Sequence, residues 1–352
     1  MLERDNFTIE HIRTLQQQTK RDPALLERVL FAFGLVEALT RAGTPFIFKG
    51  GTSLLLLMDS PRRISTDIDI VVDPKIDIDS YINRAATSFP FTYKEEQHRV
   101  GQNGIVKRHF KFFYDSPLRS NELYILLDIL YEDSVYNSIT VKPIVNDLLL
   151  TKKPISEVRI PTLECMAGDK LTAFAPHITG IPFGVGKELE IIKQFFDIAM
   201  LVDSINNLAD VRSTYQRAFV AEAGYRGLNA DWHDGLTDTI RACVCIMGKG
   251  KYDPDEFSLF AKGIDAIKGH IFSGRYSGEI AAVQACKVMY LAACLFVEAP
   301  KFRTIPSIED YQDIAITDNR FVKLSYIRKL DLEAYAYLIE AIKLIKGINV
   351  SL

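Results

Sequence analysis

The sequence contains few cysteines and no motif that would pair them. Its 352 residues include only five, an odd number, and the two closest have Cys-x-Cys rather than Cys-x-x-Cys spacing. This pattern excludes a disulfide framework and a cysteine zinc site, so we expect each cysteine to be a small buried apolar residue. The five cysteines are Cys165, Cys243, Cys245, Cys286 and Cys294.

Charge of one sign, targeting signals and long apolar runs are also lacking. The net charge is −3, so no overall basic field indicates a nucleic-acid partner, and such binding would rely on a local patch. The N-terminal residues, MLERDNFTIEHIR, are polar and mixed in charge, unlike a signal peptide, and no apolar run reaches membrane-spanning length. With 48% hydrophobic and 25% charged residues, we expect a cytoplasmic globular protein with a sizeable core.

Several common catalytic motifs are absent as well. The chain has no P-loop, no Gly-x-Ser-x-Gly and no Cys/His pair for nucleophilic catalysis, and its six histidines show no metal-ligand spacing. It also has no internal repeat and no low-complexity tract. These absences exclude the most familiar hydrolase and nucleotide-binding signatures.

One segment, residues 46–73, carries most of the chemistry that the sequence suggests, and it reads FIFKGGTSLLLLMDSPRRISTDIDIVVD. Its first apolar residues predict a buried strand, and Gly50-Gly51 ends this strand with a turn that lets the backbone approach a ligand closely. Thr52 and Ser53 follow where a helix should begin, so backbone N–H groups and hydroxyls gather at a helix N-terminus. This arrangement predicts an anion site suited to phosphate.

The second half of the segment supplies carboxylates. Residues 66–72 alternate as a strand, which places Asp67 and Asp69 on the same face. Two adjacent carboxylates repel one another unless a divalent cation neutralises them, and their hard oxygen ligands suit Mg²⁺. A Gly-Gly turn and an exposed Asp-x-Asp are each common in structural roles, but a phosphate site one helix away from a carboxylate pair indicates phosphoryl or nucleotidyl transfer.

At this point the sequence resembles a known family, in KGGTSL followed by RRISTDIDI. It is similar to the polymerase-β-like nucleotidyltransferase superfamily and, more closely, to the AbiEii/AbiGii-type toxin nucleotidyltransferases, over about residues 20–200. The resemblance implies an α+β fold, with a minimal nucleotidyltransferase domain built on a short mixed sheet, followed by a mostly helical C-terminal domain. We expect these domains to span residues 1–204 and 205–352.

Apolar periodicity predicts the remaining elements. Helices are expected near residues 1–43, 75–88, 161–175, 187–203, 207–222, 229–247, 255–268, 278–297, 307–315 and 331–347. Strands are expected at 91–95, 107–114 and 123–131, with a turn at 101–104 and extended pieces between 141 and 158. The strand KRHFKFFY at 107–114 interleaves basic and aromatic residues, which is typical either of a nucleic-acid-facing surface or, more simply, of a half-buried strand.

Asp128 is the one acid inside the apolar strand at 123–131. A carboxylate in a buried strand is costly unless it is paired or metal-bound. The resemblance implies a third carboxylate on a neighbouring strand, which completes the metal site and helps to deprotonate the attacking hydroxyl, and Asp128 is the candidate. Glu132 and Asp133 lie at the strand end and are expected to be solvated.

Lys170 is a further candidate because Glu164, Lys170 and Ala173 match a Glu…Lys…Ala pattern of the family. The resemblance implies that Lys170 contacts nucleotide phosphates as a point charge. The alternative is an ordinary surface lysine.

Lys193 and Asp197 share a helix face at i, i+4 and match the ends of a family pattern, although Gln194 stands where an acid is frequent. Asp197 would hold Lys170 or Lys193 in position or bind substrate directly. An ordinary ion pair on a helix surface is the competing interpretation.

The resemblance implies an Mg²⁺-dependent nucleotidyltransferase with a two-metal site. Its catalytic residues would be Asp67, Asp69, Asp128, Lys170 and Asp197, with Asp67, Asp69 and Asp128 as metal ligands. Its nucleotide-binding residues would be Lys49, Gly50, Gly51, Thr52, Ser53, Arg63, Ser65 and Lys193, with Lys49 alternatively leaving the strand end for solvent.

The biological role implied is the toxin of a toxin–antitoxin or phage-abortive system, with a separately encoded antitoxin protein. Such a toxin transfers NMP from an NTP to RNA, tRNA 3′ ends included, and pyrophosphate leaves. Two alternatives stay open: transfer to a small molecule or a protein, and a catalytically inactive nucleotide-binding module. The nucleotide, the acceptor and the oligomeric state do not follow from the sequence.

Overall fold

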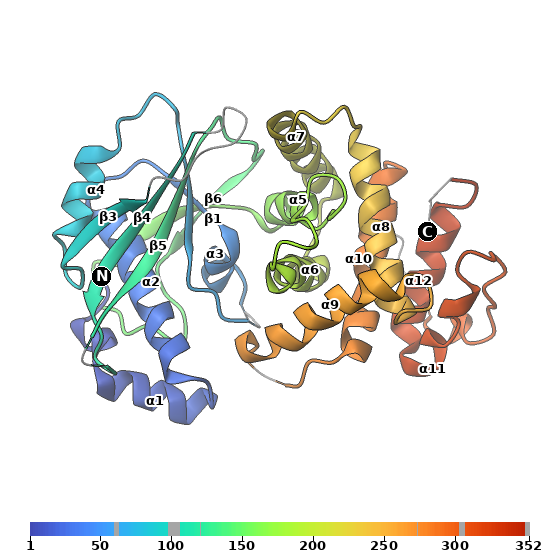
Figure 1. Cartoon of the computed structure of the whole chain (residues 1–352), viewed down its shortest axis with the longest axis horizontal. Coiled ribbons are helices and arrows are strands. Elements are labelled where there is room, and N and C mark those ends of the chain that lie inside the picture. The colour runs from blue at the N-terminus through green and yellow to red at the C-terminus, as the bar shows by residue number, and fades with distance from the viewer. Residues whose placement is uncertain (60–62, 98–105, 120, 273, 303–306, 349–352) are drawn as a thin grey trace. The chain divides into compact units, whose positions relative to one another are not determined.

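The computed structural model describes residues 1–59, 63–97, 106–119, 121–272, 274–302 and 307–348 (Figure 1). The turn predicted at 101–104 lies outside these ranges. By its internal contacts the chain divides into two units, one of residues 1–162 and 269–274 and one of residues 163–268 and 275–352. The boundary differs from the predicted 204–205 because the helices between residues 163 and 202 pack on later helices rather than on the sheet.

The first unit is built on a five-stranded mixed sheet of order β1-β2-β5-β4-β3. Only β2 and β5 are parallel, and the other three neighbouring pairs are antiparallel. A separate antiparallel pair, β6 and β7, follows. The short mixed sheet expected from the resemblance is therefore confirmed. The strands are β1 (Ile47–Lys49), β2 (Ile68–Val72), β3 (Tyr93–Gln97), β4 (Val106–Asp115), β5 (Glu122–Tyr131), β6 (Ile139–Pro143) and β7 (Glu157–Pro161).

The helices of the first unit are η1 (Arg4–Phe7), α1 (Ile9–Thr19), α2 (Pro23–Arg41), α3 (Gly50–Leu57) and α4 (Asp79–Ala86). As predicted, α2 starts at Asp22-Pro23, where the Asp22 side chain accepts a hydrogen bond from the Ala24 N–H at 2.8 Å. The helix predicted at 75–88 is confirmed but shorter, because residues before Asp79 form turns.

One face of the sheet forms the core of this unit. Phe110, Phe112 and Tyr114 of β4 alternate with partly exposed residues and are fully buried. Phe31 of α2 stacks on Tyr114 with ring centroids 3.7 Å apart, and Figure 1 shows α2 behind the strands. Burial of each such aromatic side chain contributes about 1.5–3 kcal/mol, so this face anchors the sheet to α2.

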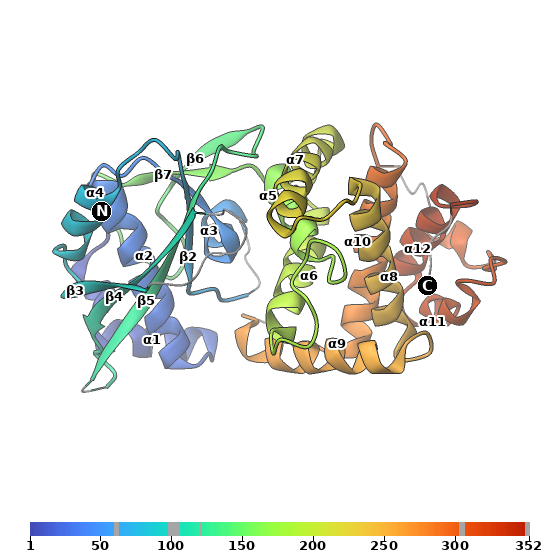
Figure 2. The same ribbon diagram turned by 45° about the horizontal axis from the view of Figure 1, so that its top comes forward.

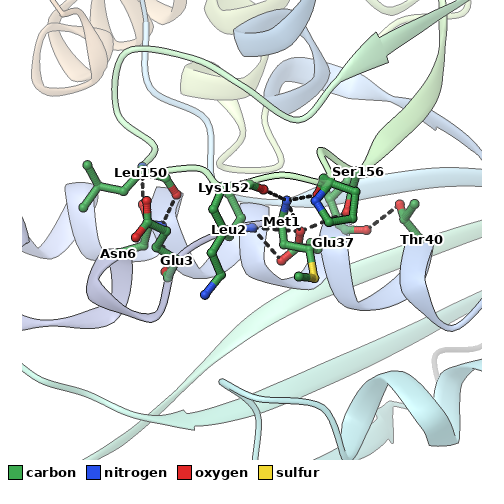
Figure 3. A network of polar contacts seen from close by, with 11 residues as sticks. Met1, Leu2, Glu3, Asn6, Glu37, Thr40, Leu150, Lys152 and Ser156 are labelled. Atoms are coloured by element: carbon green, nitrogen blue, oxygen red, sulfur yellow. Dashed lines mark hydrogen bonds and ion pairs between the residues drawn. The ribbon is translucent and has the colours of Figure 1, made fainter.

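A polar network ties residues 1–6 to α2 and to the segment before β7 (Figure 3). Glu37 of α2 is 8% exposed and accepts hydrogen bonds from the Leu2 N–H at 2.9 Å and from Ser156 Oγ at 3.0 Å. Asn6 Nδ2 donates to the Leu150 carbonyl at 2.7 Å, and the Leu150 N–H donates back to Asn6 Oδ1 at 2.8 Å. A buried carboxylate is tolerated here because these donors satisfy it.

The second unit is helical. Its elements are α5 (Leu163–Ala173), α6 (Glu188–Val202), α7 (Leu208–Arg226), α8 (Trp232–Gly248), α9 (Pro254–Ala266), η2 (Ile267–His270, which runs into the first unit), α10 (Gly278–Phe296), η3 (Glu309–Tyr311), η4 (Val322–Leu324), α11 (Ile327–Leu330) and α12 (Leu332–Leu344). The helix predicted at 307–315 is wrong, since only the short η3 forms there. The reason is that Tyr311 is the one well-buried residue in a polar run, too little apolar surface to hold a longer helix.

Helix α10 is the central helix of the second unit, in contact with α6, α8 and α12 (Figure 2). By length and composition it could cross a membrane, so the prediction that no apolar run reaches that length is wrong. Because 72% of its most apolar window is buried by the rest of the protein, its composition is that of a core helix. It carries Cys286 and Cys294, and all five cysteines are buried and form no disulfide, as predicted.

Candidate active site

A row of polar side chains crosses the five-stranded sheet at one level. Strand register pairs Lys49 of β1 with Asp69 of β2, Asp69 with Asp128 of β5, and Asp128 with His109 of β4. Residues paired across neighbouring strands point to the same face, which here is the face opposite the α2 core. Asp67 is exposed and lies two residues before Asp69, just ahead of β2. The structure therefore brings the predicted carboxylates together.

Asp69 lies against the turn at which α3 begins. A Cβ on Gly50 would lie 2.2 Å from Asp69 Oδ2, and Gly50 has a φ of +81°. Both the close approach and the backbone conformation therefore require glycine at this position. The first turn of α3 is consequently held beside the carboxylate row, and Lys49 at its N-cap makes no side-chain capping hydrogen bond.

The hydroxyls of Thr52 and Ser53 hold this turn in place. Thr52 Oγ1 donates to the Asp67 carbonyl at 2.7 Å, and Ser53 Oγ donates to the Gly50 carbonyl at 2.8 Å. Both side chains are fully buried. The hydroxyls thus fix the position of the turn relative to Asp67, and an anion at this helix end would meet backbone N–H groups.

Arg63 and Ser65 converge on Gly51. A Cβ on Gly51 would lie 2.5 Å from Arg63 Nη2 and 2.7 Å from Ser65 Oγ. Arg63 is only 7% exposed, and its Nη1 donates to the Ile64 carbonyl at 3.2 Å. The guanidinium therefore lies directly beside the Gly-Gly turn, where it adds positive charge to the helix end.

A distant segment, which the sequence did not reveal, fixes the loop that carries Arg63. The Ile64 N–H donates to the His270 carbonyl at 2.6 Å, and Arg63 and Ile271 form an isolated antiparallel bridge. Arg21 Nε donates to the Phe272 carbonyl at 2.8 Å, which ties the same segment to the loop before α2. Residues 269–274 thus complete the first unit although they lie far along the chain.

His109 is a site residue that the sequence analysis missed. Its Nδ1 lies 2.6 Å from Asp128 Oδ1, and the two side chains are 12% and 38% exposed. Asp128 is therefore less buried than its apolar strand suggested, and its hydrogen-bond partner offsets part of its desolvation. The available signal was the alternation of KRHFKFFY, in which His109 lies out of phase with the buried Phe110 and Phe112.

The second unit holds the remaining candidates. Lys170 Nζ of α5 lies 2.7 Å from Asp197 Oδ2 of α6, with side chains 5% and 3% exposed, and it also donates to Gln194 Oε1 at 3.2 Å. Lys170 is thus not a surface lysine, and Asp197 holds Lys170 in place. Lys193 Nζ lies 3.8 Å from Glu190 Oε1 on α6.

The donor set on the sheet suits Mg²⁺. Asp69 and Asp128 lie side by side, with Asp67 nearby, and all offer carboxylate oxygens. Across the described ranges, no three Asp, Glu, His or Cys side chains are arranged to hold an ion by themselves. Proteins usually bind Mg²⁺ through one or two carboxylates together with substrate phosphates and water.

Comparisons with known proteins identify a family and two similar solved structures. The model of a family described as "Nucleotidyl transferase AbiEii toxin, Type IV TA system" matches residues 35–264, more than half of the chain. The solved structure of JHP933 from Helicobacter pylori is 17% identical, with a TM-score of 0.44 over 77% of this chain and 93% of that one. A second H. pylori structure, described as a candidate nucleotidyltransferase, is 15% identical, with a TM-score of 0.45 over 77% and 96%. A comparison with curated proteins finds no match.

Proposed function

Because the chain belongs to the AbiEii family of type IV toxin–antitoxin nucleotidyltransferases, we propose that it transfers NMP from an NTP to the 3′ end of an RNA in an Mg²⁺-dependent reaction. Family membership implies a nucleotide substrate and an antitoxin partner. The Mg²⁺ ion and the RNA acceptor are the proposed parts. The observation that carries the proposal is the side-by-side pairing of Asp69 and Asp128, with Asp69 against the start of α3.

The triphosphate would bind at the Gly-Gly turn. Backbone N–H groups at residues 51–53 point out of the first turn of α3, and the buried Arg63 supplies a fixed positive charge beside Gly51. Asp67, Asp69 and Asp128 would hold Mg²⁺, which when bound neutralises charge on the triphosphate. Ser65 would help to hold the loop that carries Arg63 beside the Gly-Gly turn.

Asp128 would act on the acceptor. Its Oδ1 accepts a hydrogen bond from His109, which orients the carboxylate. In this position Asp128 would accept the proton of the 3′-hydroxyl as that oxygen attacks the α-phosphorus, and pyrophosphate leaves with the bond to the α-phosphorus broken. Proton abstraction by a positioned carboxylate contributes about 10²–10⁴-fold in rate.

The second unit would contribute a preset positive charge. Asp197 and Gln194 hold the Lys170 ammonium, and an ammonium has three donors, so Lys170 can add a phosphate to these two partners. Lys193 on the same helix as Asp197 would add a second cation for the nucleotide.

In its biological setting the chain would act in the cytoplasm as the toxin of a phage-defence pair. Modification of RNA 3′ ends, those of tRNA included, would stop translation until the antitoxin restrains the enzyme. The five cysteines are buried and form no disulfide, which fits a reducing compartment.

The direct test is transfer of label from each of four α-labelled NTPs to a total RNA pool in the presence of Mg²⁺. We expect RNA labelling with at least one nucleotide, abolished by Asp69→Asn. Asp73→Asn is the matched control, because Asp73 is an exposed carboxylate just beyond the other end of β2. Absence of RNA labelling with all four nucleotides, or labelling that survives Asp69→Asn, would contradict the proposal.

A further inference from the structure

The two faces of strands β4 and β5 differ in burial. Phe112 and Ile125 face α2 and are fully buried. Their neighbours Phe113 and Tyr124 face the other way and remain partly exposed, and Tyr93 on β3 is 41% exposed. Large aromatic side chains thus gather on the face of the sheet that also carries Asp69 and Asp128.

These three rings form a continuous aromatic platform, defined by Tyr93, Phe113 and Tyr124. Register places them side by side on three adjacent strands. Tyr93 and Phe113 stack with centroids 4.5 Å apart and planes 9° from parallel, and Tyr124 lies next to Phe113 with centroids 5.7 Å apart and planes tilted by 58°. Lys111 Nζ lies 4.4 Å from the centre of the Tyr124 ring. The platform is therefore ordered by its own contacts and flanked by a cation.

The platform leads to the carboxylate row. Tyr124 and Asp128 lie four residues apart on β5, and at about 3.3 Å per residue this separation is about 13 Å. Lys111 is paired with Leu126, which lies midway between them on the same face. From Asp128 outward, the face therefore presents a carboxylate, then a lysine, then stacked rings.

We propose that the aromatic platform binds the unpaired bases at the 3′ end of the acceptor RNA, a few nucleotides from the hydroxyl that reacts at Asp128. Every base has a π-face, so stacking on such rings is tolerant of sequence. Lys111, on β4 between the rings and Asp128, would meet the phosphates between the stacked bases and the reacting end, and Lys107 lies on the same face beyond Asp128.

The charged side chains on this face are consistent with an RNA that runs from the aromatic platform toward Asp128. Lys107, His109 and Lys111 lie in a row along β4, the middle one of the three strands that carry the platform. Glu95 of β3 lies opposite Lys111, and Asp115 and Glu122 pair with each other beyond the rings, on the side away from Asp128. Glu122 Oε2 accepts a hydrogen bond from the Tyr93 hydroxyl at 2.7 Å, which fixes the outer ring of the platform. A partner with alternating negative groups and flat rings fits this alternation of cation and aromatic, and a single-stranded nucleic acid is such a partner.

This inference rests on the proposed function for the identity of the acceptor, but its test does not need catalysis. A short 5′-fluorescein-labelled single-stranded RNA of mixed sequence is titrated with the full chain, without NTP, and binding is followed by fluorescence anisotropy. In the variant Phe113→Leu/Tyr124→Leu the rings are lost but apolar volume is kept. We expect the Kd to rise about tenfold or more, because stacking of a base on one ring is worth about 5- to 150-fold in affinity.

Three comparisons make the result specific. Phe89→Leu removes a ring that is 54% exposed elsewhere in the same unit, and it should leave the Kd unchanged. Lys111→Ala should reduce the slope of log K against log salt by about one. Blunt-ended duplex RNA should compete poorly, since its bases are stacked internally. An unchanged melting temperature in the double variant shows that the fold is retained.

Other outcomes would overturn the inference. RNA binding within twofold of the native chain by the folded double variant would show that the platform does not hold the acceptor. A raised KM for NTP with unchanged RNA binding would assign the rings to the base of the donor nucleotide, and loss of antitoxin binding with unchanged RNA binding would assign them to a protein partner. If RNA is bound through the platform but never labelled, the proposed transferase function fails while this inference stands.

Discussion

Two of the candidate site carboxylates, Asp128 and Asp197, each contact a basic side chain, and the two pairs are built differently. Asp128, beside His109 on the sheet of the first unit, keeps 38% of its side chain exposed, whereas Asp197, beside Lys170 in the second unit, keeps 3%. A carboxylate that remains accessible can take up a proton or an ion during a reaction. A buried carboxylate in a close ion pair is committed to its partner, and its removal leaves an uncompensated charge. We therefore expect Asp128 to take part in the reaction and Asp197 to hold Lys170 in position.

The largest effect that this comparison predicts is on the rate of transfer in Asp128→Asn. We expect kcat for nucleotidyl transfer to fall by about 10²–10⁴-fold, because the asparagine cannot accept the hydroxyl proton. Urea unfolding should show a change in stability of only about 0.5 kcal/mol, since the side chain is partly exposed. A large loss of stability with unchanged turnover would reverse the assigned roles of the two pairs.

The buried pair should respond in the opposite way. Asp197→Ala should lower the free energy of unfolding by about 3–5 kcal/mol, because the Lys170 ammonium is left buried without its counter-charge. The measurement is urea unfolding of the full chain. Asp203→Ala is the control for an exposed ion pair, because Asp203 at the end of the same helix lies 2.7 Å from Lys287 Nζ and keeps 51% of its side chain exposed.

The double variant Lys170→Met/Asp197→Leu sharpens this prediction. Replacement of both charges by apolar side chains of similar size should restore most of the stability. If Lys170 also binds phosphate, the restored protein should still have a raised KM for NTP. A native KM in the stable double variant would assign the pair to structure alone.

A smaller effect is expected for the partner of the exposed carboxylate. His109→Ala should lower transfer by about 10–100-fold, the usual effect of removing a group that orients a metal-site ligand. His109→Gln, which can still donate to Asp128, should recover part of the loss. Equal activity of the two variants would show that the hydrogen bond at 2.6 Å does not orient Asp128 for the reaction.

The smallest effect concerns His177, which contacts two carboxylates. It serves as a control because it is a histidine–carboxylate contact outside the residues proposed to carry out nucleotidyl transfer. His177 lies 2.6 Å from Asp238 and 2.5 Å from Glu256, and hydrogen bonds to these carboxylates raise the pKa of His177 to about 9. Because the folded-state pKa is raised above the usual 6.5, the stabilisation is complete below about pH 6.5 and is lost as the pH rises toward about 9.

His177→Gln should therefore be less stable than the native chain at pH 6 by about 1–2 kcal/mol, a value reduced for the partial exposure of the ring. The difference should shrink toward pH 9 in urea titrations at a series of pH values. Under conditions in which both proteins are folded, His177→Gln and the native chain should have the same rate of nucleotidyl transfer. A stability difference that grows with pH would contradict the assignment.

The sequence predicted the parts of the site that are close together in the chain. The Gly-Gly turn, the start of α3 and the Asp-x-Asp pair lie within residues 46–73, so local turn and strand rules were enough to group them. Asp128 was found because a single acid in an apolar strand is conspicuous. The mixed sheet followed by helices was implied by the resemblance and is confirmed.

The parts that the sequence did not reveal depend on register and long-range packing. His109 reaches Asp128 only because β4 pairs with β5 at that register. The loop of Arg63 is fixed by residues 269–272, about two hundred residues later, which no local pattern can indicate. The division of the chain at residue 162 follows from the packing of α5 and α6 on later helices, and the apolar length of α10 reflects its central position.

The central claim is that Asp69 and Asp128 form one catalytic unit, and a double-mutant cycle tests it most directly. Nucleotidyl transfer to RNA is measured for Asp69→Asn, Asp128→Asn and the double variant under single-turnover conditions. If the two carboxylates act together, the double variant will be about as slow as the slower single variant, because residues of one catalytic unit are strongly non-additive. Rate losses that multiply in the double variant would show that the two residues act independently and would contradict the account.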